Sequence, residues 1–102
     1  MSTFFITRHP GAREWARQEG IKVDFVFAHL DSRILRPGDV VIGTLPVHLA
    51  AQVCALGGRY YNLSLATPPG RRGSEFSAND LRAFGACLEE YMVVPVEAVD
   101  IP

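Results

Sequence analysis

Hydrophobic and polar positions along the chain alternate between strand-like and helix-like patterns. Short apolar runs rich in β-branched and aromatic residues predict strands at residues 3–7, 23–30 and 39–45. An alternating pattern, with Tyr61, Leu63 and Leu65 on one face, predicts a strand at residues 59–65. A further apolar run covers residues 92–99, where an internal proline favours a strand at the edge of a sheet. The pattern therefore predicts five strands.

Helical signals separate several of these strands. Residues 12–20 place Ala12, Trp15 and Ala16 on one helical face. Residues 46–56 begin with proline, which suits the first turn of a helix because its missing N–H has no intrahelical partner there. This second helix is apolar almost all round, so we expect it to be buried in the core or at a subunit contact.

A third helix is expected to start at Ser77, which forms a capping-box pattern with Asp80. Its apolar stripe would consist of Leu81, Phe84, Leu88 and Tyr91. The alternation of strands and helices predicts an α/β fold, with a mostly parallel five-stranded sheet, helices on both faces and a single domain over residues 1–102. The link at residues 31–38 is short for a helical crossover, so the second strand is either antiparallel or joined by an extended crossing.

Composition narrows the class of protein. The net charge of −1 argues against a protein that binds long nucleic acid, although nine of the ten basic residues are arginines, which suit phosphate pairing. No apolar run reaches the roughly 20 residues needed to cross a bilayer, and the first residues lack the pattern of a signal peptide. We therefore expect a cytoplasmic protein without membrane contact, with Cys54 and Cys87 as buried free thiols.

Candidate binding residues cluster where three strands are expected to end. Ligands of open α/β sheets bind beyond the carboxyl ends of the strands, where helix N-termini point. These ends fall at residues 7–11, 43–48 and 67–74. The candidate ligand-binding residues there are Thr7, Pro10, Gly11, Gly43, Thr44, Leu45, Pro46, Arg71 and Arg72.

Arg8, His9 and His48 are the candidate catalytic residues. Arg8 could pair with a phosphate, and His9 could move protons, since an unperturbed imidazole titrates near pH ~6.5. Alternatively, Arg8 is a solvated charge and His9 only caps the turn. His48 shares a helical face with Gln52, so it either serves the site or marks the solvent side of its helix. The pair Arg71-Arg72 is either a basic lid or a solvated loop tip.

Several chemistries lack their motifs in this sequence. It holds no closely spaced metal-ligand pair, no G-x-G-x-x-G, no P-loop lysine motif and no G-x-S-x-G elbow. Arg8-His9 only faintly resembles the Arg-His-Gly motif of histidine phosphatases, because Pro10 replaces the glycine. Arginine, histidine and backbone N–H groups suit cleavage of RNA by its own 2′-hydroxyl. We therefore expect neither a metal nor a cofactor.

Several segments resemble a known family. FFITRHPGA at residues 4–12, EWA at residues 14–16, HLD at residues 29–31 and, more closely, GDVVIGTLPVHLAA at residues 38–51 are similar to a small family of CRISPR-associated accessory proteins of type III systems. That resemblance implies a ring nuclease, which binds cyclic oligoadenylate, expected here to be the tetra-adenylate, and cleaves it to switch off signalling. It also implies a Rossmann-like domain related to cyclic-oligoadenylate-sensing domains, and a homodimer. The alternative is a module that binds or sequesters the messenger without cleaving it.

Overall fold

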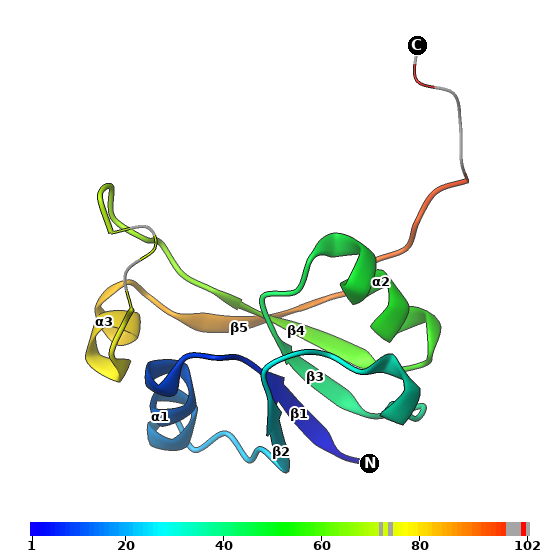
Figure 1. Cartoon of the computed structure of the whole chain (residues 1–102), viewed down its shortest axis with the longest axis horizontal. Coiled ribbons are helices and arrows are strands. Elements are labelled where there is room, and N and C mark those ends of the chain that lie inside the picture. The colour runs from blue at the N-terminus through cyan, green and yellow to red at the C-terminus, as the bar shows by residue number, and fades with distance from the viewer. Residues whose placement is uncertain (72, 74, 98–100, 102) are drawn as a thin grey trace.

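The computed structural model of the protein describes residues 1–71, 73, 75–97 and 101. Five strands, three α-helices and one 3-10 helix (η1) follow one another in these residues. In chain order they are β1 (Thr3–Ile6), α1 (Pro10–Gln18), β2 (Phe25–Phe27), η1 (Ser32–Ile34), β3 (Val40–Gly43), α2 (Val47–Ala55), β4 (Arg59–Ser64), α3 (Ala78–Ala83) and β5 (Cys87–Tyr91). Figure 1 shows α1 and α3 side by side at one end of the sheet and α2 at the other.

The five strands form one sheet in the order β2-β1-β3-β4-β5. The pairs β1–β2, β1–β3 and β3–β4 are parallel, whereas β5 runs antiparallel to β4. The predicted α/β fold with a mostly parallel five-stranded sheet is therefore confirmed, although the sheet is mixed because of its last strand. Parallel β1, β2, β3 and β4 all end at the same edge of the sheet.

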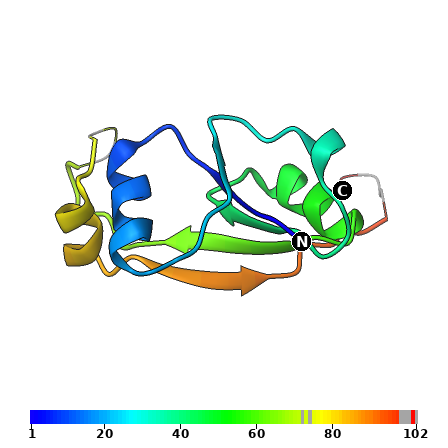
Figure 2. The same ribbon diagram turned by 90° about the horizontal axis from the view of Figure 1, so that it is seen from below.

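The link between β2 and β3 is an extended crossing that contains only the three-residue η1. Asp31 caps η1 by accepting a hydrogen bond of 3.0 Å from the backbone N–H of Arg33. Figure 2 shows this link arching over the sheet toward α2, and Leu35 belongs to the same buried cluster as Ala50 and Val53 of α2. Of the two alternatives that the sequence leaves open, the structure shows the parallel strand with a short crossing.

Neighbouring residues of each strand point to opposite faces of the sheet, which gives two apolar cores. Phe5, Ile42 and Leu63 pack against α1 and α3. Phe4, Val41 and Tyr60 pack on the other face, beneath α2. The predicted helices on both faces are confirmed, and so is the buried face of α1, which consists of Ala12, Trp15 and Ala16.

The third helix and the fifth strand differ from the prediction. α3 ends at Ala83, and Gly85 follows with a φ of 73°, a conformation that favours glycine and turns the chain back. Leu88 and Tyr91 therefore lie on β5 rather than on a helical stripe, and Leu88 pairs with Leu63 of β4. Residues 92–97 form no strand, and positions 98 and 99 of the predicted strand lie outside the described residues.

Both cysteines have free thiols, but the prediction that both are buried is wrong. Cys87 is exposed on the edge strand β5, because the helix predicted to contain it ends at Ala83. Cys54 is half-buried on α2, and its Sγ accepts a hydrogen bond of 3.4 Å from the N–H of Val93. Within the described part of the chain, no helix has the length and apolar character needed to cross a membrane.

The start of β3 is tied to the N-terminus by one buried carboxylate, which leads to a first prediction. Asp39 is 4% exposed and accepts hydrogen bonds of 2.9 Å from the N–H groups of Ser2 and Arg36. These bonds lower the pKa of Asp39 below its ordinary value of 3.8. Asp39→Asn should lower the free energy of unfolding by about 1–3 kcal/mol, because an amide oxygen cannot satisfy both donors.

The pH dependence follows from the lowered pKa. The carboxylate stabilises the folded state fully above pH 3.8, and this contribution is lost as the pH falls through the folded pKa. Urea unfolding at pH 7 and at pH 3 checks both statements, with the exposed Glu19→Gln as the control. Equal stability of Asp39→Asn and the wild type at pH 7 would contradict the role of Asp39.

Candidate functional site

The carboxyl ends of β1, β2 and β3 converge on one cleft, which we call the exit cleft. Its volume is about 360 Å³. It is lined by Ile6, Thr7, Arg8, His9, Ala28, His29, Leu30, Thr44, Leu45, Pro46 and Leu49. The described residues that line the cleft include one arginine and two histidines but no carboxylate. The cleft therefore suits an anionic ligand.

The turn after β1 is organised by Thr7. The N–H of Thr7 donates a hydrogen bond of 2.9 Å to the carbonyl of Phe27 in β2. The Thr7 Oγ1 accepts a bond of 3.1 Å from the N–H of His9, just before α1 begins at Pro10. His9 is the N-cap residue of α1 through its backbone carbonyl, which accepts a hydrogen bond of 3.1 Å from the N–H of Ala12, whereas its side chain makes no capping hydrogen bond. Arg8 and His9 are both exposed at the cleft.

The turn after β3 is stabilised by a hydrogen bond to Tyr60 of β4. Its buried hydroxyl accepts a hydrogen bond of 2.9 Å from the N–H of Leu45. The same oxygen lies 3.1 Å from the carbonyl oxygen of Gly43 and 2.7 Å from Oδ1 of Asn62. Burial raises the pKa of the Tyr60 hydroxyl, so it keeps its proton and can donate to either oxygen. Tyr60 thus fixes the backbone that carries Thr44 and Leu45 into the cleft.

The close packing of β1 against β3 explains why position 43 is a glycine. A Cβ at this position would lie 2.9 Å from the carbonyl oxygen of Ile6, closer than real side chains approach. Glycine therefore lets the ends of β1 and β3 lie tightly together.

A second cavity, which we call the apolar cavity, lies on the other face of the sheet at the same edge. Its volume is about 150 Å³. It is lined by Phe5, Ile6, Thr7, His9, Ala12, Gly43, Thr44, Leu63, Leu65, Phe76 and Leu81. Ile6, Thr7, His9 and Thr44 line both cavities, so the two hollows meet at the ends of β1 and β3.

The structure brings together most of the residues predicted at the first two strand ends. Those that line the exit cleft are Thr7, Arg8, His9, Thr44, Leu45 and Pro46. Pro10 lines a separate groove along α1. Gly11 lies against the backbone of Phe76, where a Cβ would overlap the Phe76 carbonyl oxygen. His48 is exposed in the first turn of α2 and lines neither cavity.

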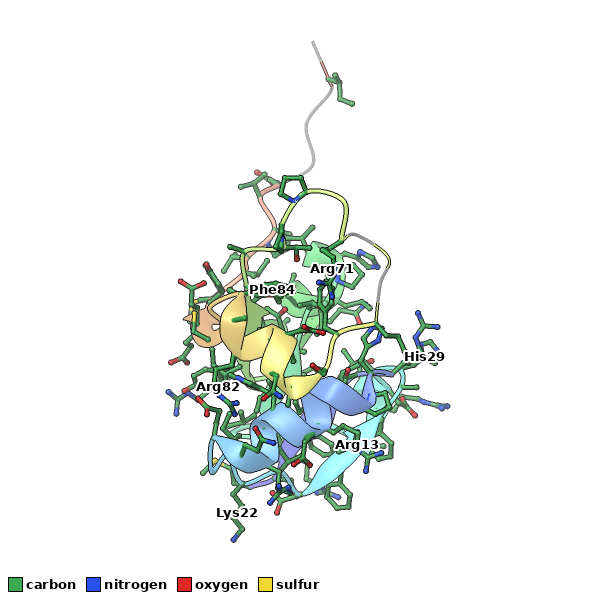
Figure 3. All side chains as sticks on the ribbon, turned by 90° about the vertical axis from the view of Figure 1, so that its left-hand side faces the viewer. Arg13, Lys22, His29, Arg71, Arg82 and Phe84 are labelled. Carbon is green, nitrogen blue, oxygen red and sulfur yellow. The ribbon has the colours of Figure 1, made fainter. Side chains whose placement is uncertain are left out.

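Arg71 lies in a different environment from the one expected. Its guanidinium carbon is 5.4 Å from the ring centre of Phe76 and 5.5 Å from that of Phe84, and its Nη2 is 3.5 Å from Oδ2 of Asp80. Figure 3 shows Arg71 and Phe84 on the same side of the molecule, above α3. Arg71 is thus packed on two rings with 43% of its side chain exposed, and it does not line the exit cleft. Its part in a basic lid stays a prediction. Arg72 lies outside the described residues.

His29 is the functional candidate that sequence reasoning missed. It is exposed at the end of β2 and lines the exit cleft, as His9 does. The available signal was its position near the end of the strand predicted at residues 23–30. That signal could not be used because the direction of the second strand was undecided, and an antiparallel strand would have placed His29 at the opposite edge.

Comparison with known proteins identifies the family of the chain. Residues 4–94 match the family described as "Putative CRISPR-associated protein (Cas_VVA1548)". The chain belongs to this family. The match includes the ends of β1, β2 and β3 and therefore the whole exit cleft. Searches of the curated proteins and of the solved structures found no significant match.

The contact between Tyr60 and the β3 turn gives a second prediction. Tyr60→Phe removes the acceptor of the Leu45 N–H, so the free energy of unfolding should fall by about 1–3 kcal/mol. The Leu45 amide should also exchange its hydrogen faster. Urea unfolding and hydrogen exchange measure these effects, with Tyr91→Phe on the exposed edge strand as the control. Unchanged exchange at Leu45 would show that Tyr60 does not hold the turn.

Proposed function

We propose that this CRISPR-associated protein is a ring nuclease that binds and cleaves cyclic oligoadenylate, taken to be cyclic tetra-adenylate, and so ends type III CRISPR signalling. The observation that carries the proposal is the meeting of the β1 end and the β3 end in one cationic cleft. A cyclic oligoadenylate is a ring of anionic phosphodiesters. Arg8 and the N-termini of α1 and α2 are groups that bind phosphates well, and the histidines can move protons.

The substrate carries its own nucleophile, so the reaction needs no co-reactant. The 2′-oxygen of one ribose attacks the adjacent phosphorus, the bond from phosphorus to the 5′-oxygen breaks, and the products are a 2′,3′-cyclic phosphate and a 5′-hydroxyl. In the proposal, Arg8 pairs with the phosphoryl oxygens as charge develops on them, and His9 accepts the 2′-hydroxyl proton. A second histidine returns a proton to the leaving 5′-oxygen.

Two histidines compete for this second role. His29 lines the exit cleft together with His9, which favours it as the proton donor. His48, the residue expected from the sequence, lies at the start of α2 and would reach a substrate that extends beyond the cleft. Thr7, Thr44, Leu45 and Pro46 would position the ring, since they line the same cleft.

The fold also supports a relation to messenger-sensing domains. The strand order β2-β1-β3-β4-β5 occurs in doubly wound Rossmann-like sheets, whose ligands bind at the carboxyl edge where the order reverses. In this protein the reversal lies at β1 and β3, where the exit cleft opens. Two departures from that pattern are the antiparallel β5 and the 3-10 helix in place of an α-helix between β2 and β3.

A homodimer is part of the proposal. A cleft of about 360 Å³ has the size of a site for one small ligand, whereas a ring of four nucleotides is larger. In the first turn of α2, directly after Pro46 of the cleft, Val47 is 71% exposed. An exposed apolar residue beside the cleft suits contact with a second copy, which would add its own cleft to the same ring.

Cleavage assays on the purified protein test the function. Wild type should convert cyclic tetra-adenylate to linear products that end in a 2′,3′-cyclic phosphate, equally well with and without EDTA. His9→Ala should lower kcat by roughly 10²- to 10⁴-fold and change binding little, because it removes a proton acceptor rather than a charge partner. Product chromatography and calorimetry measure the two effects, with Arg82→Ala as the control. Wild-type rates for His9→Ala and Arg8→Ala would refute the assigned roles.

The same experiment separates the remaining alternatives. If stoichiometric protein releases an intact ring after heating, the protein is a sequestering module instead of a nuclease. Comparing His29→Ala with His48→Ala identifies the proton donor. We expect the larger fall in kcat for His29→Ala, since only His29 of these two lines the cleft.

A further inference from the structure

The apolar cavity is separate from the exit cleft but adjoins it, since both are lined by Ile6, Thr7, His9 and Thr44. The large apolar residues that line it are Phe5, Leu63, Leu65, Phe76 and Leu81. About 150 Å³ is well below the roughly 300–1,000 Å³ of a site for a drug-sized ligand. The cavity therefore has the size of one small ring system rather than a whole nucleotide.

Phe76 is one of two aromatic residues that line this cavity, the other being the buried Phe5 of β1, and three contacts hold Phe76 in place. Its backbone carbonyl lies against Gly11 of α1, in space that any Cβ at position 11 would fill. Its ring meets Phe84 edge to face, with centres 5.0 Å apart and planes at 76°. Arg71 lies over both rings and pairs with Asp80. The wall is thus fixed from α1, from α3 and from the preceding loop.

The part of a nucleotide that the cavity would hold follows from the position of the base relative to the phosphodiester. In single-stranded RNA the charged backbone and the apolar bases point in different directions, and proteins commonly stack the unpaired bases on aromatic side chains. A phosphodiester bound by Arg8 in the exit cleft would place its ribose near His9, which lines both hollows. The attached base would then lie at the mouth of the apolar cavity.

We propose that the apolar cavity is a nucleobase pocket that takes one purine base of the substrate, with Phe76 as its stacking wall and Gly11 and Arg71 as positioning residues. This inference rests on the proposed function and adds a specificity determinant to it. A pyrimidine fills less of the cavity and stacks on Phe76 over a smaller area, so the pocket favours purines. Arg71 acts through Phe76 and does not touch the substrate.

The test measures binding in a His9→Ala background, so that the ring stays intact. Phe76→Ala should weaken binding of cyclic tetra-adenylate by roughly 5- to 100-fold, as expected for the loss of one base stack. Phe76→Tyr should restore binding, because it keeps the aromatic wall. Phe25→Ala is the matched control, since Phe25 is 48% exposed on the edge strand β2 and lines neither cavity.

Two further measurements distinguish a base pocket from general structural damage. Gly11→Ala should displace Phe76, so the double variant with Phe76→Ala should lose no more affinity than Phe76→Ala alone. Arg71→Lys should weaken binding as Arg71→Ala does, because lysine lacks the planar group that stacks on both rings. In the active protein, Phe76→Ala should raise KM and leave kcat within a few-fold.

The outcomes separate the inference from the function. Wild-type preference for cyclic tetra-adenylate over cyclic tetra-uridylate, abolished by Phe76→Ala, supports the pocket. Wild-type affinity in a folded Phe76→Ala variant overturns the pocket but leaves the nuclease intact. A wild-type protein that neither binds nor cleaves either ring overturns the proposed function and the pocket with it.

Discussion

Parallel pairing of β1 with both of its neighbours is the constraint on which the site depends. Because β2, β1 and β3 run in the same direction, their carboxyl ends meet at one edge of the sheet. His29, Arg8 and Thr44 follow these three ends and come from distant parts of the chain. An antiparallel β2 would have removed His29 from the cleft and left one histidine on its wall.

Tyr60 and Gly11, on opposite faces of the sheet, stabilise the conformation of the segments at this edge. Beneath α2, the buried hydroxyl of Tyr60 holds the backbone after β3 through Leu45. Beneath α1 and α3, the absence of a side chain at Gly11 lets Phe76 close the apolar cavity. Neither residue has to touch a ligand. Each fixes a segment that does line a cavity, and this explains why substitutions at these positions would act at a distance from the chemistry.

At the carboxyl edge of the sheet, the charged cleft lies on one face and the apolar cavity on the other. The proposed activity depends on this separation. The exit cleft carries Arg8, His9 and His29 for an anionic backbone, while the apolar cavity offers ring and aliphatic surface. A single-stranded nucleotide has this division of character between its phosphate and its base.

The sequence by itself determined the elements whose periodicity is unambiguous: β1, α1, β3, α2 and β4, the two-faced sheet, and the pairing of residues 7–9 with residues 44–46 in one site. It could not determine the direction of β2, since a short apolar run predicts a strand but not whether the strand pairs parallel or antiparallel with its neighbour. Nor could it separate the end of α3 from β5, because Leu88 fits a helical stripe and a strand face equally well, and only pairing with Leu63 decides between them. The apolar cavity, the packing of Arg71 and the role of His29 also depended on tertiary structure. Each arises from contacts between segments far apart in the chain, and local residue patterns carry no information about such contacts.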